Sequence, residues 1–378
     1  MKSRISFLLL LPLCLALLLS SCGFSNYNLP TDFSSVELIY ENDPSRYYYN
    51  QLTDDGKTAY TLIVNNISEH PEKIEIPQID EDEFGKVFYA VTYDNPGILC
   101  FGMTSSVKDD GNKFFYVPEY SANKEECDKK INELNTAVSE FLKTVPENSS
   151  DYEKELLTHD YICDKCIYVY NEGESLKGSS YDAIINGEAV CEGYARAAKL
   201  FLDKLSVINY LICGDATNSD GKTESHMWNI VNIDGKNYHL DLTWDDYDND
   251  SAAVSHSYFN LSDDMIKANH FNLAPSDNNC VSTDANYFKV NNLMFESFTK
   301  NEKKTMTSTA VKNVRNSCNQ VEVCFVNAYA FNKAITDLAD KSGIYDVLDD
   351  VNKQCGKKFS SVTYAEDDDI YTVQFVFE

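Results

Sequence analysis

Hydrophobic residues recur at helical spacing in four segments of the first half of the chain. Apolar side chains three and four positions apart form one face of a helix, so this spacing predicts amphipathic helices. The segments are residues 45–68, 81–94, 124–143 and 151–166. Two short apolar runs, 98–103 and 114–117, flank a polar stretch and predict a β-hairpin. We therefore expect a small α+β region over residues 35–120, with further helices after it.

The last part of the chain shows a second mixture of the two periodicities. Residues 321–326 predict a strand, whereas the patterns over 328–341 and 344–354 predict helices. Two alternating runs near the end, 359–365 and 370–377, predict a closing hairpin. These elements indicate a separate α+β region over residues 301–378.

Between these regions, residues 121–290 contain the clearest helical stripe. From Tyr194 the apolar positions are 194, 197, 198, 201, 202 and 205, which is the pattern of a helix packed on a core. Cys191 lies three residues before the stripe, in the expected first turn. The unpaired amides and the positive dipole end of a helix favour a thiolate there, and the thiolate is the nucleophilic form of cysteine. The alternative is that Cys191 packs as a small hydrophobic side chain.

A base for such a nucleophile is found in the segment 225–244. The dipeptide Asp234-Gly235 predicts a two-residue hairpin turn. Pairing outward from this turn places Ile230 opposite His239, Trp228 opposite Asp241, and His226 opposite Thr243. Because side chains alternate along a strand, all six of these side chains share one face. Asp241 then becomes a diagonal neighbour of His226, where its carboxylate can orient the imidazole.

His239 lies on the same face and is the rival base. We favour His226, because His239 is better placed to pack beside Ile230. Each residue also has an alternative structural role. His226 could be a buried histidine whose ring nitrogens are hydrogen-bonded, and Asp241 could be a carboxylate that bonds to a loop backbone. A metal site built from Cys191, His226 and Asp241 matches no common ligand spacing. We therefore expect neither a metal ion nor another cofactor.

The order Cys191, His226, Asp241 resembles the transglutaminase-like superfamily of papain-type cysteine enzymes. The similar segments are residues 155–161, 189–195, 226–228, 235–243 and 258–263. The resemblance covers about 151–270 and implies an α+β fold with a papain-like, transglutaminase-like core over 121–290. In such a core the helix that carries the nucleophile packs on an antiparallel sheet, and the flanking regions 35–120 and 301–378 are smaller α+β additions.

The resemblance also implies a chemistry. Cys191 would attack a peptide or amide carbonyl, His226 would carry the proton, and Asp241 would orient His226. The thioester would be resolved by water, as in a protease or amidase, or by an amine, as in a transglutaminase; we lean towards hydrolysis. The Cys191 backbone N–H and the side chain of Tyr181 are candidate oxyanion donors. The expected partner is a protein or peptide substrate. The alternative function is a catalytically silent surface binding or scaffold protein with the same fold.

The N-terminus predicts export. Lys2 and Arg4 precede the apolar run 5–19, which is typical of a secretory signal over residues 1–21. The sequence Leu-Ser-Ser-Cys at 19–22 resembles a bacterial lipobox, in which Cys22 is lipidated and becomes the mature N-terminus. Residues 22–34 lack periodicity and are expected to be a tether. These features predict a lipid-anchored protein on the extracellular face of a bacterial cell membrane.

The charge of the chain narrows the choice of partners. The formal net charge is −28, and loss of Lys2 and Arg4 leaves 30 basic against 60 acidic residues. A surface of this sign repels nucleic acid and anionic lipid head groups. We expect no nucleic-acid partner, and membrane contact only through the lipid. The acidic run 245–250 fails the EF-hand pattern: counted from Asp246, Ser251 and Ser257 stand at the sixth and twelfth positions, where glycine and glutamate are needed. We therefore expect a solvated acidic loop there.

The cysteine count argues against a fully cross-linked scaffold. Twelve cysteines are present, and ten remain once Cys14 leaves with the signal and Cys22 is lipidated. If Cys191 is a free thiol, at least one more cysteine is unpaired, although some bridges remain possible in an exported protein. The pair Cys163 and Cys166 has redox or metal spacing, but no second such pair follows, and we expect ordinary thiols.

Overall fold

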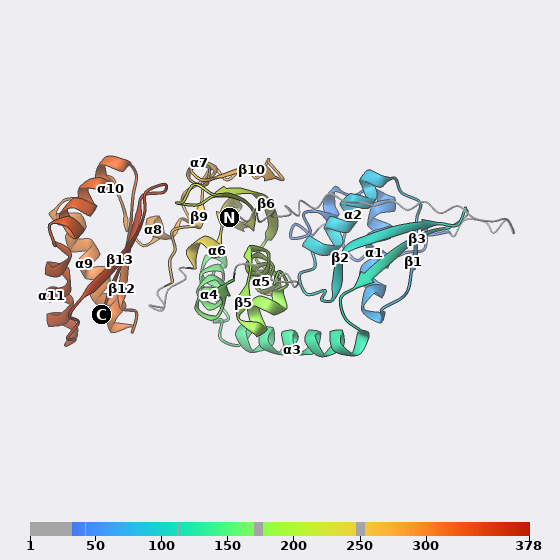
Figure 1. Ribbon diagram of the computed structural model, residues 1–378, viewed down its shortest axis with the longest axis horizontal. Helices are drawn as coiled ribbons and strands as arrows, with labels where there is room; N and C mark the ends of the chain where they lie inside the picture. The colour runs from blue at the N-terminus through green and yellow to red at the C-terminus, as the bar shows by residue number, and fades with distance from the viewer. Residues whose placement is uncertain (1–31, 42, 112, 170–176, 247–253) are drawn as a thin grey trace, which may run out of the picture.

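The computed structural model describes residues 32–41, 43–111, 113–169, 177–246 and 254–378. Three α+β units follow one another along its long axis, in the order of the chain (Figure 1). The expected signal peptide, Cys22 and most of the tether lie outside the described residues. Within the described part of the chain, no helix has the length and apolarity needed to span a membrane.

The N-terminal unit is a three-stranded antiparallel sheet packed with two helices. The sheet has the order β1-β3-β2. Its elements are η1 Tyr49–Gln51, α1 Asp54–Asn66, η2 Ile67–Glu69, β1 Ile74–Ile76, α2 Glu81–Tyr93, β2 Phe101–Asp109 and β3 Phe114–Tyr120. The predicted hairpin and the helix over 81–94 are confirmed. The helix predicted from residue 45 begins only at Asp54, because Thr53 caps it by accepting a hydrogen bond from the backbone N–H of Gly56.

Two helices lead from this unit into the central one. Helix α3 (Lys124–Leu142) runs beneath both units, and α4 (Asp151–Lys165) starts with a capping box between Ser150 and Glu153 (Figure 1). A disulfide joins Cys100 to Cys127 and ties the start of α3 to the N-terminal sheet. The other cysteines within the described residues are free thiols, as expected for a scaffold that is not fully cross-linked.

The central unit is built on a five-stranded antiparallel sheet with the order β10-β6-β7-β8-β9. Its elements are β4 Ile167–Tyr168, η3 Asp182–Asn186, β5 Glu188–Ala189, α5 Cys191–Lys204, β6 Asn209–Thr217, β7 Thr223–Ile233, β8 Lys236–Leu240, α6 Leu242–Asp245, β9 Phe259–Leu261, α7 Asp263–Ile266 and β10 His270–Ala274. Helix α5 buries Tyr194, Ala197, Ala198, Phe201 and Leu202 against the central core, so the predicted stripe is confirmed. The helix that begins at Cys191 thus packs on an antiparallel sheet, as expected.

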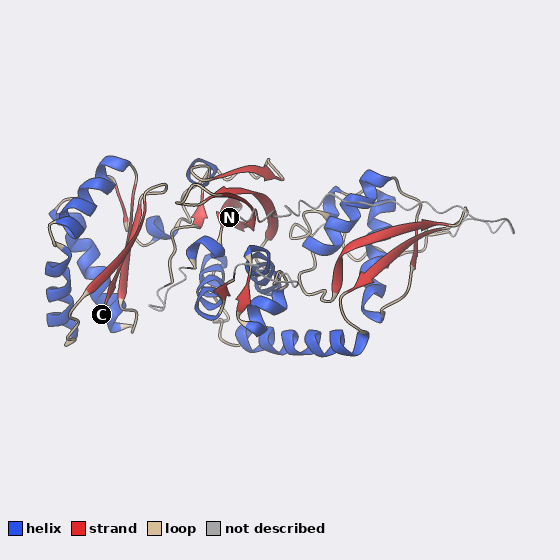
Figure 2. Ribbon diagram, viewed as in Figure 1, coloured by secondary structure: helices blue, strands red, loops and turns tan. Residues whose placement is uncertain are grey.

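The C-terminal unit places the helices that follow residue 300 on the outer side of a four-stranded sheet (Figure 2). Its elements are α8 Tyr287–Val290, β11 Met294–Phe295, α9 Lys300–Arg315, β12 Gln320–Phe325, α10 Ala328–Ile335, η4 Thr336–Asp340, α11 Ile344–Cys355, β13 Val362–Asp367 and β14 Thr372–Phe377. The core of this unit already includes Phe288, Leu293 and Phe295. It therefore starts near residue 287, and the boundary predicted at 301 is too late.

The inner face of this sheet is polar and meets the central unit. Val321, Val323 and Phe375 point into the C-terminal core, whereas the residues between them point the other way. Gln320 Nε2 donates to the Val254 carbonyl at 2.7 Å, and Thr372 bonds to Ser257 at 2.7 Å. The C-terminal unit is thus held to the central unit by hydrogen bonds between buried polar groups.

The N-terminal unit contacts helix α5 through charged and polar groups. Arg46 forms an ion pair with Asp203 at 3.1 Å, and Lys199 Nζ donates to the Ser45 carbonyl at 3.0 Å. Arg196 donates to the Thr92 carbonyl at 2.7 Å. These contacts lie between Arg196 and Asp203, so the N-terminal unit packs alongside the middle and the end of the helix that starts with Cys191.

The acidic run after β8 is not a simple solvated loop at its start. Asp245 is fully buried, where it bonds to the His159 ring and accepts the backbone N–H of Tyr258. Asp246 accepts a hydrogen bond from the Tyr194 hydroxyl. The prediction is therefore wrong for these two residues, because a buried histidine and a buried tyrosine supply their partners. The rest of the run lies outside the described residues.

Candidate active site

Cys191 is the first residue of α5, as predicted. The preceding residue, Val190, has extended backbone geometry and supplies no side-chain cap, so the first-turn amides are not capped by it. Cys191 is partly exposed and packs with Tyr93, Leu211 and Met227. The chain therefore holds this thiol at the positive end of a long helix and at the edge of a hydrophobic cluster.

A close backbone approach shapes the turn that carries the thiol. A Cβ atom at Gly193 would lie 2.7 Å from the Ala189 Cβ and 3.0 Å from the Lys177 carbonyl oxygen. Only glycine fits between these groups without a shift of the backbone. The segment around Lys177 consequently lies directly against the first turn of α5.

The hairpin that carries the proposed base has the predicted register near its turn. Ile233 pairs with Lys236, and Ile230 pairs with His239. Pairing ends at Asn229 and Leu240, so the expected pairs of Trp228 with Asp241 and of His226 with Thr243 are wrong. The chain leaves the strand here because Asp241 becomes the N-cap of α6.

Asp241 contacts His226 although it lies beyond the last paired position of its strand. The Asp241 Oδ2 atom lies 2.6 Å from His226 Nε2 and 3.1 Å from His270 Nε2. Its Oδ1 atom accepts the backbone N–H groups of Thr243 at 3.0 Å and Trp244 at 3.3 Å. Both carboxylate oxygens therefore have two partners each, which fixes the direction of the carboxylate.

Electrostatics favour the charged pair of His226 and Asp241. Burial opposes a charge on the imidazole, but the neighbouring Asp241 carboxylate offsets this effect and raises the pKa of His226 to about 10. The nearby Cys191 side chain contributes in the same direction. Burial also opposes ionisation of Asp241, yet the charge of His226 holds the pKa of this carboxyl well below its usual range. Because Nε2 faces Asp241, Nδ1 is the ring nitrogen left for the thiol.

His270 is a member of this cluster that the sequence analysis missed. Its Nδ1 atom lies 2.7 Å from the Asn269 side-chain oxygen, and its Nε2 atom faces Asp241. Burial lowers the pKa of His270, so the ring is predominantly neutral beside the charged pair. His270 begins β10, which pairs with β6 at the far edge of the sheet. The sequence of the hairpin between β7 and β8 does not indicate this residue.

Aromatic rings enclose His226. The Trp228 ring is stacked on it at a centroid distance of 5.5 Å, and the Trp244 ring lies 6.2 Å away. Trp228 is held in turn by His239, whose Nδ1 accepts the indole N–H at 3.1 Å. The Nε2 atom of His239 bonds to Asp263 at 2.9 Å. The rival histidine is thus engaged in a buried support for Trp228, which agrees with the packing role expected for it.

Tyr181 and Glu192 both have partners of their own. The Tyr181 hydroxyl donates to Glu133 Oε2 at 2.6 Å, so its hydrogen is directed at a carboxylate of α3. This contact gives no support to the predicted oxyanion role of Tyr181. The Glu192 carboxylate accepts hydrogen bonds from Arg196, at 2.9 Å and 2.8 Å. Its negative charge beside Cys191 is therefore largely balanced.

The other cysteines near the site resemble structural thiols. Cys163 and Cys166 are buried and unbridged, and burial raises their pKa values to about 11 and about 12. Three groups of side chains within the described residues have ligand atoms close enough to hold a metal ion. One of them consists of His226, Asp241 and His270.

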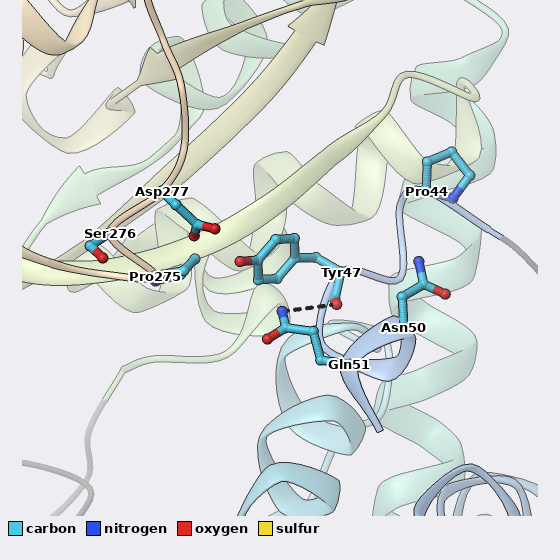
Figure 3. A pocket seen from close by; sticks show the side chains of 7 residues that line it. All are labelled: Pro44, Tyr47, Asn50, Gln51, Pro275, Ser276 and Asp277. Atoms are coloured by element: carbon cyan, nitrogen blue, oxygen red, sulfur yellow. Dashed lines mark hydrogen bonds between the residues drawn. The ribbon is translucent and has the colours of Figure 1, made fainter. Parts of the chain in front are cut away.

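A separate hollow of about 550 Å³ lies between the start of the N-terminal unit and the loop after β10 (Figure 3). Its walls include Tyr47, Gln51, Pro275 and Asp277. The Tyr47 ring is stacked on Tyr210 at 4.3 Å. None of the residues that line this hollow belongs to the cluster around Cys191, so the hollow does not define the reaction site.

Comparisons with known protein families and with curated proteins find no match for this chain. Two solved structures are similar to parts of it. A TGase shares 15% sequence identity over 45% of this chain and 50% of its own, with a TM-score of 0.27. A “putative cysteine protease” from Cytophaga hutchinsonii shares 12% identity over 37% of this chain and 61% of its own, with a TM-score of 0.24. The chain thus spans about half of the first protein, and likeness at this level assigns no activity.

Proposed function

We propose that this chain is a cysteine acyl-transfer enzyme acting on peptide or amide bonds, with Cys191, His226 and Asp241 as its catalytic residues. The observation that carries the proposal is the 2.6 Å contact between His226 Nε2 and Asp241 Oδ2, on an imidazole whose pKa the Cys191 side chain also helps to raise. A nucleophile, a base and a group that orients the base thus meet in one place.

Each residue has one task in the proposed reaction. In the reacting ion pair the proton of Cys191 resides on His226 Nδ1, and Sγ attacks the carbonyl carbon of the substrate. Asp241 stabilises the imidazolium that results and keeps its Nε2 proton in place. His226 then protonates the leaving amine as the carbon–nitrogen bond breaks and the thioester forms. Water or a second amine attacks the thioester, His226 removes a proton from this acceptor, and the proton returns to the Cys191 sulfur.

The oxyanion of the tetrahedral intermediate needs a donor close to Cys191. The backbone N–H of Cys191 fits this role, because the first N–H groups of a helix have no partner within the helix. The helix dipole acts in the same direction, since α5 points its positive end at the reacting atoms. The proposal therefore relies on the backbone and does not use Tyr181.

The N-terminal unit contributes a residue to the surroundings of the thiol. Tyr93, at the end of α2, packs in the same cluster as Cys191 and Cys213. This contact supports a role for the N-terminal unit in shaping the approach of the substrate. The C-terminal unit could also shape the approach of the substrate, and deleting residues 301–378 tests this role. Full activity of the shortened chain on every substrate tested would contradict it.

The proposed location is the extracellular face of a bacterial cell membrane, with Cys22 lipidated and a protein or peptide as substrate. The lipobox-like sequence at 19–22 supports this proposal. Changing Cys22→Ser should release the chain from the membrane fraction into the medium. Retention of the variant in the membrane fraction would contradict lipid anchoring.

The activity is tested by the rate at which iodoacetamide alkylates Cys191 between pH 5 and pH 9. Mass spectrometry assigns each modified cysteine, and a short unstructured peptide with one cysteine serves as the reference thiol. At pH 6 we expect Cys191 to react at least about 10-fold faster than the peptide thiol, because an imidazolium at Nδ1 stabilises its thiolate. His226→Gln should abolish the advantage of Cys191 and leave the peptide thiol unchanged, and Cys191→Ala confirms the assignment of the site.

A Cys191 that reacts no faster than the peptide thiol and is indifferent to His226→Gln would contradict the proposal. It would support the alternative, a catalytically silent binding protein. If the thiol is activated, peptides incubated with and without a fluorescent primary amine separate the two acceptors. Cleavage without incorporation of the amine, which we expect, would indicate hydrolysis.

A further inference from the structure

A second cluster of histidines and carboxylates lies between the central and C-terminal units. His159 and Asp160 belong to α4, and His256 lies in the segment before β9. The Asp160 Oδ1 atom is 3.0 Å from His159 Nδ1 and 2.9 Å from His256 Nε2. Ligand atoms of these three residues all lie within 4.8 Å of one another. Two imidazoles thus converge on one carboxylate oxygen.

The remaining ring nitrogens also face carboxylates. His159 Nε2 lies 3.2 Å from Asp245 Oδ2, and His256 Nδ1 lies 2.9 Å from Glu322 Oε1. Both outer carboxylates are held in place by backbone groups: Asp245 accepts the N–H of Tyr258, and Glu322 accepts the N–H of His256. An outer carboxylate that orients a histidine through its second nitrogen is the usual support of a metal-binding histidine.

We propose that His159 Nδ1, His256 Nε2 and Asp160 Oδ1 bind one divalent transition-metal ion of the zinc class. Imidazole and carboxylate are the ligands that such ions take in proteins. With neutral imidazoles, each ring donates its other N–H to Asp245 or Glu322. A 2+ charge then balances most of the negative charge that three carboxylates bring together in this cluster.

The distances suit a tetrahedral ion. Metal–ligand bonds of about 2.0–2.1 Å place tetrahedral ligand atoms roughly 3.3 Å apart. The two contacts to Asp160 Oδ1 are within about 0.4 Å of that separation. Asp160 provides the access path, because its side chain is 45% exposed whereas those of His159 and His256 are buried. The fourth position is left for water or another ligand on the exposed side.

The two other groups of possible ligands are less suited to a metal ion. In the group of His226, Asp241 and His270, both imidazoles face the same Asp241 oxygen, and the second nitrogen of His270 faces the Asn269 amide instead of an outer carboxylate. In the third group His239 Nδ1 accepts the indole N–H of Trp228, so its Nε2 must carry a proton towards Asp263 and has no lone pair for a metal. Within the described residues, only the cluster around Asp160 gives each histidine an outer carboxylate.

The site would join the two units. His159 and Asp160 belong to the central unit, whereas Glu322 lies on β12 of the C-terminal unit. Asp245 ends the short helix α6 that Asp241 caps. A bound ion would therefore fasten the polar interface and support the helix on which the position of Asp241 depends. This departs from the expectation of a metal-free protein and does not rest on the proposed acyl-transfer activity.

The test is metal binding by the full chain after removal of metals with a chelator. We expect one Zn²⁺ per chain by elemental mass spectrometry, visible absorption bands when Co²⁺ is added, and a melting temperature raised by either ion. Asp160→Asn should weaken binding at least about 100-fold, and Glu322→Gln about 10-fold, as is usual for an outer partner. Asp160→Asn is the main variant, since its half-exposed side chain is replaced by one of the same shape.

Matched controls identify which cluster binds the ion. His256→Gln should abolish stoichiometric binding, whereas His226→Gln and His239→Gln, which alter the other two groups, should leave it intact. If His256→Gln fails to fold, Asp160→Asn decides. A chain that binds no Zn²⁺ after chelation, or one that loses its ion in His226→Gln or His239→Gln and keeps it in Asp160→Asn, would overturn the proposal.

Discussion

Asp241 has two roles that a single substitution can separate. As N-cap it accepts the backbone N–H groups of Thr243 and Trp244, and as a carboxylate it faces His226. Asparagine caps helices about as well as aspartate, so Asp241→Asn should keep α6 and remove the charge. We expect the rate at which the protein cleaves a peptide substrate to fall roughly 10²- to 10⁴-fold, as for a triad that loses its orienting carboxylate. Circular dichroism checks that the fold is retained.

The same substitution should change the dependence of stability on pH. The folded-state pKa of His226 is about 10, above the ordinary value of 6.5. The proton that folded His226 retains therefore stabilises the native state fully below about pH 6.5, and this contribution is lost as the pH rises towards 10. Urea unfolding should show wild-type stability falling relative to Asp241→Asn over this window, by at most about 1.4 kcal/mol per pH unit. Parallel curves for the two proteins would contradict a charged pair.

The sequence contained most of the candidate site but not its full geometry. The order of Cys191, His226 and Asp241 and the first pairs of the hairpin could be predicted from a helical stripe and a turn. The contact of Asp241 with His226 arises from the end of the strand, which is determined by the cap of α6 and is invisible in strand alternation. His270 comes from a distant edge strand, so no local pattern marks it.

Strand β6 places a glycine opposite the proposed base. Gly214 pairs with His226, and a Cβ atom there would lie 2.8 Å from the Phe271 carbonyl oxygen and 2.8 Å from Trp228 Cη2. Gly214→Ala should therefore displace the ring that is stacked on His226, destabilise the fold by about 1–3 kcal/mol and slow the alkylation of Cys191. Thermal unfolding and mass spectrometry measure the two effects.

A glycine in open space provides the control for that experiment. A Cβ atom at Gly85, in helix α2, would meet no atom within 4 Å. Gly85→Ala should stabilise the protein by up to about 1 kcal/mol, because alanine is the better helix former, and should leave alkylation unchanged. Equal effects of the two substitutions would show that Gly214 has no special role beside His226.

Helix α4 contains a buried carboxyl that should titrate near neutral pH. Burial raises the pKa of Glu155 to about 8, although a hydrogen bond from Asn260 at 2.8 Å opposes the shift. Folded Glu155 therefore holds a proton that the unfolded chain releases above pH 4.5, so its contribution to stability falls as the pH rises from 4.5 to 8. Glu155→Gln should remove this fall. Denaturant unfolding at several pH values tests it, and a slope equal to that of the wild type would contradict the shifted pKa.

The elements themselves were predictable to different degrees. The helices at 81–94, 124–143 and 151–166 carry both periodicity and caps, and the structure shows them within one residue of the predicted ends. Helix α9 was not predicted. Its apolar positions are few and its lysines are many, so its helical nature depends on packing against β12 and α11 within the C-terminal unit. Tertiary packing decides such cases, and a single-sequence pattern does not contain it.

The interfaces that the central unit forms with the N-terminal and C-terminal units are polar. Alternation along β12 and β14 predicts one buried face and one that meets water. The second face is instead covered by the central unit, where Gln320 and Gln374 both donate to the Val254 carbonyl. The existence of three α+β regions could be predicted from the sequence. Their docking could not, because polar residues that face a neighbouring unit follow the same pattern as residues that face solvent.

The contact between the N-terminal unit and α5 depends on a buried lysine. Lys199 is completely buried and donates to Asp203 at 3.1 Å, to the Ser45 carbonyl at 3.0 Å and to the Asn209 carbonyl at 3.2 Å. Lys199→Met keeps the length of the side chain but removes these three hydrogen bonds, while Asp203 keeps its ion pair with Arg46. We expect a loss of about 1–3 kcal/mol, measured by urea unfolding, because buried carbonyl acceptors lose their donor.

The position of this lysine makes the same variant a test of coupling along the helix. Lys204 is exposed at the end of α5, and Lys204→Met should change stability by no more than about 0.5 kcal/mol. Because Tyr93 of the N-terminal unit packs beside Cys191, loosening this interface at Lys199 should also slow the alkylation of Cys191, whereas Lys204→Met should not. An unchanged alkylation rate in a clearly destabilised Lys199→Met protein would show that the N-terminal unit supports the fold without shaping the site.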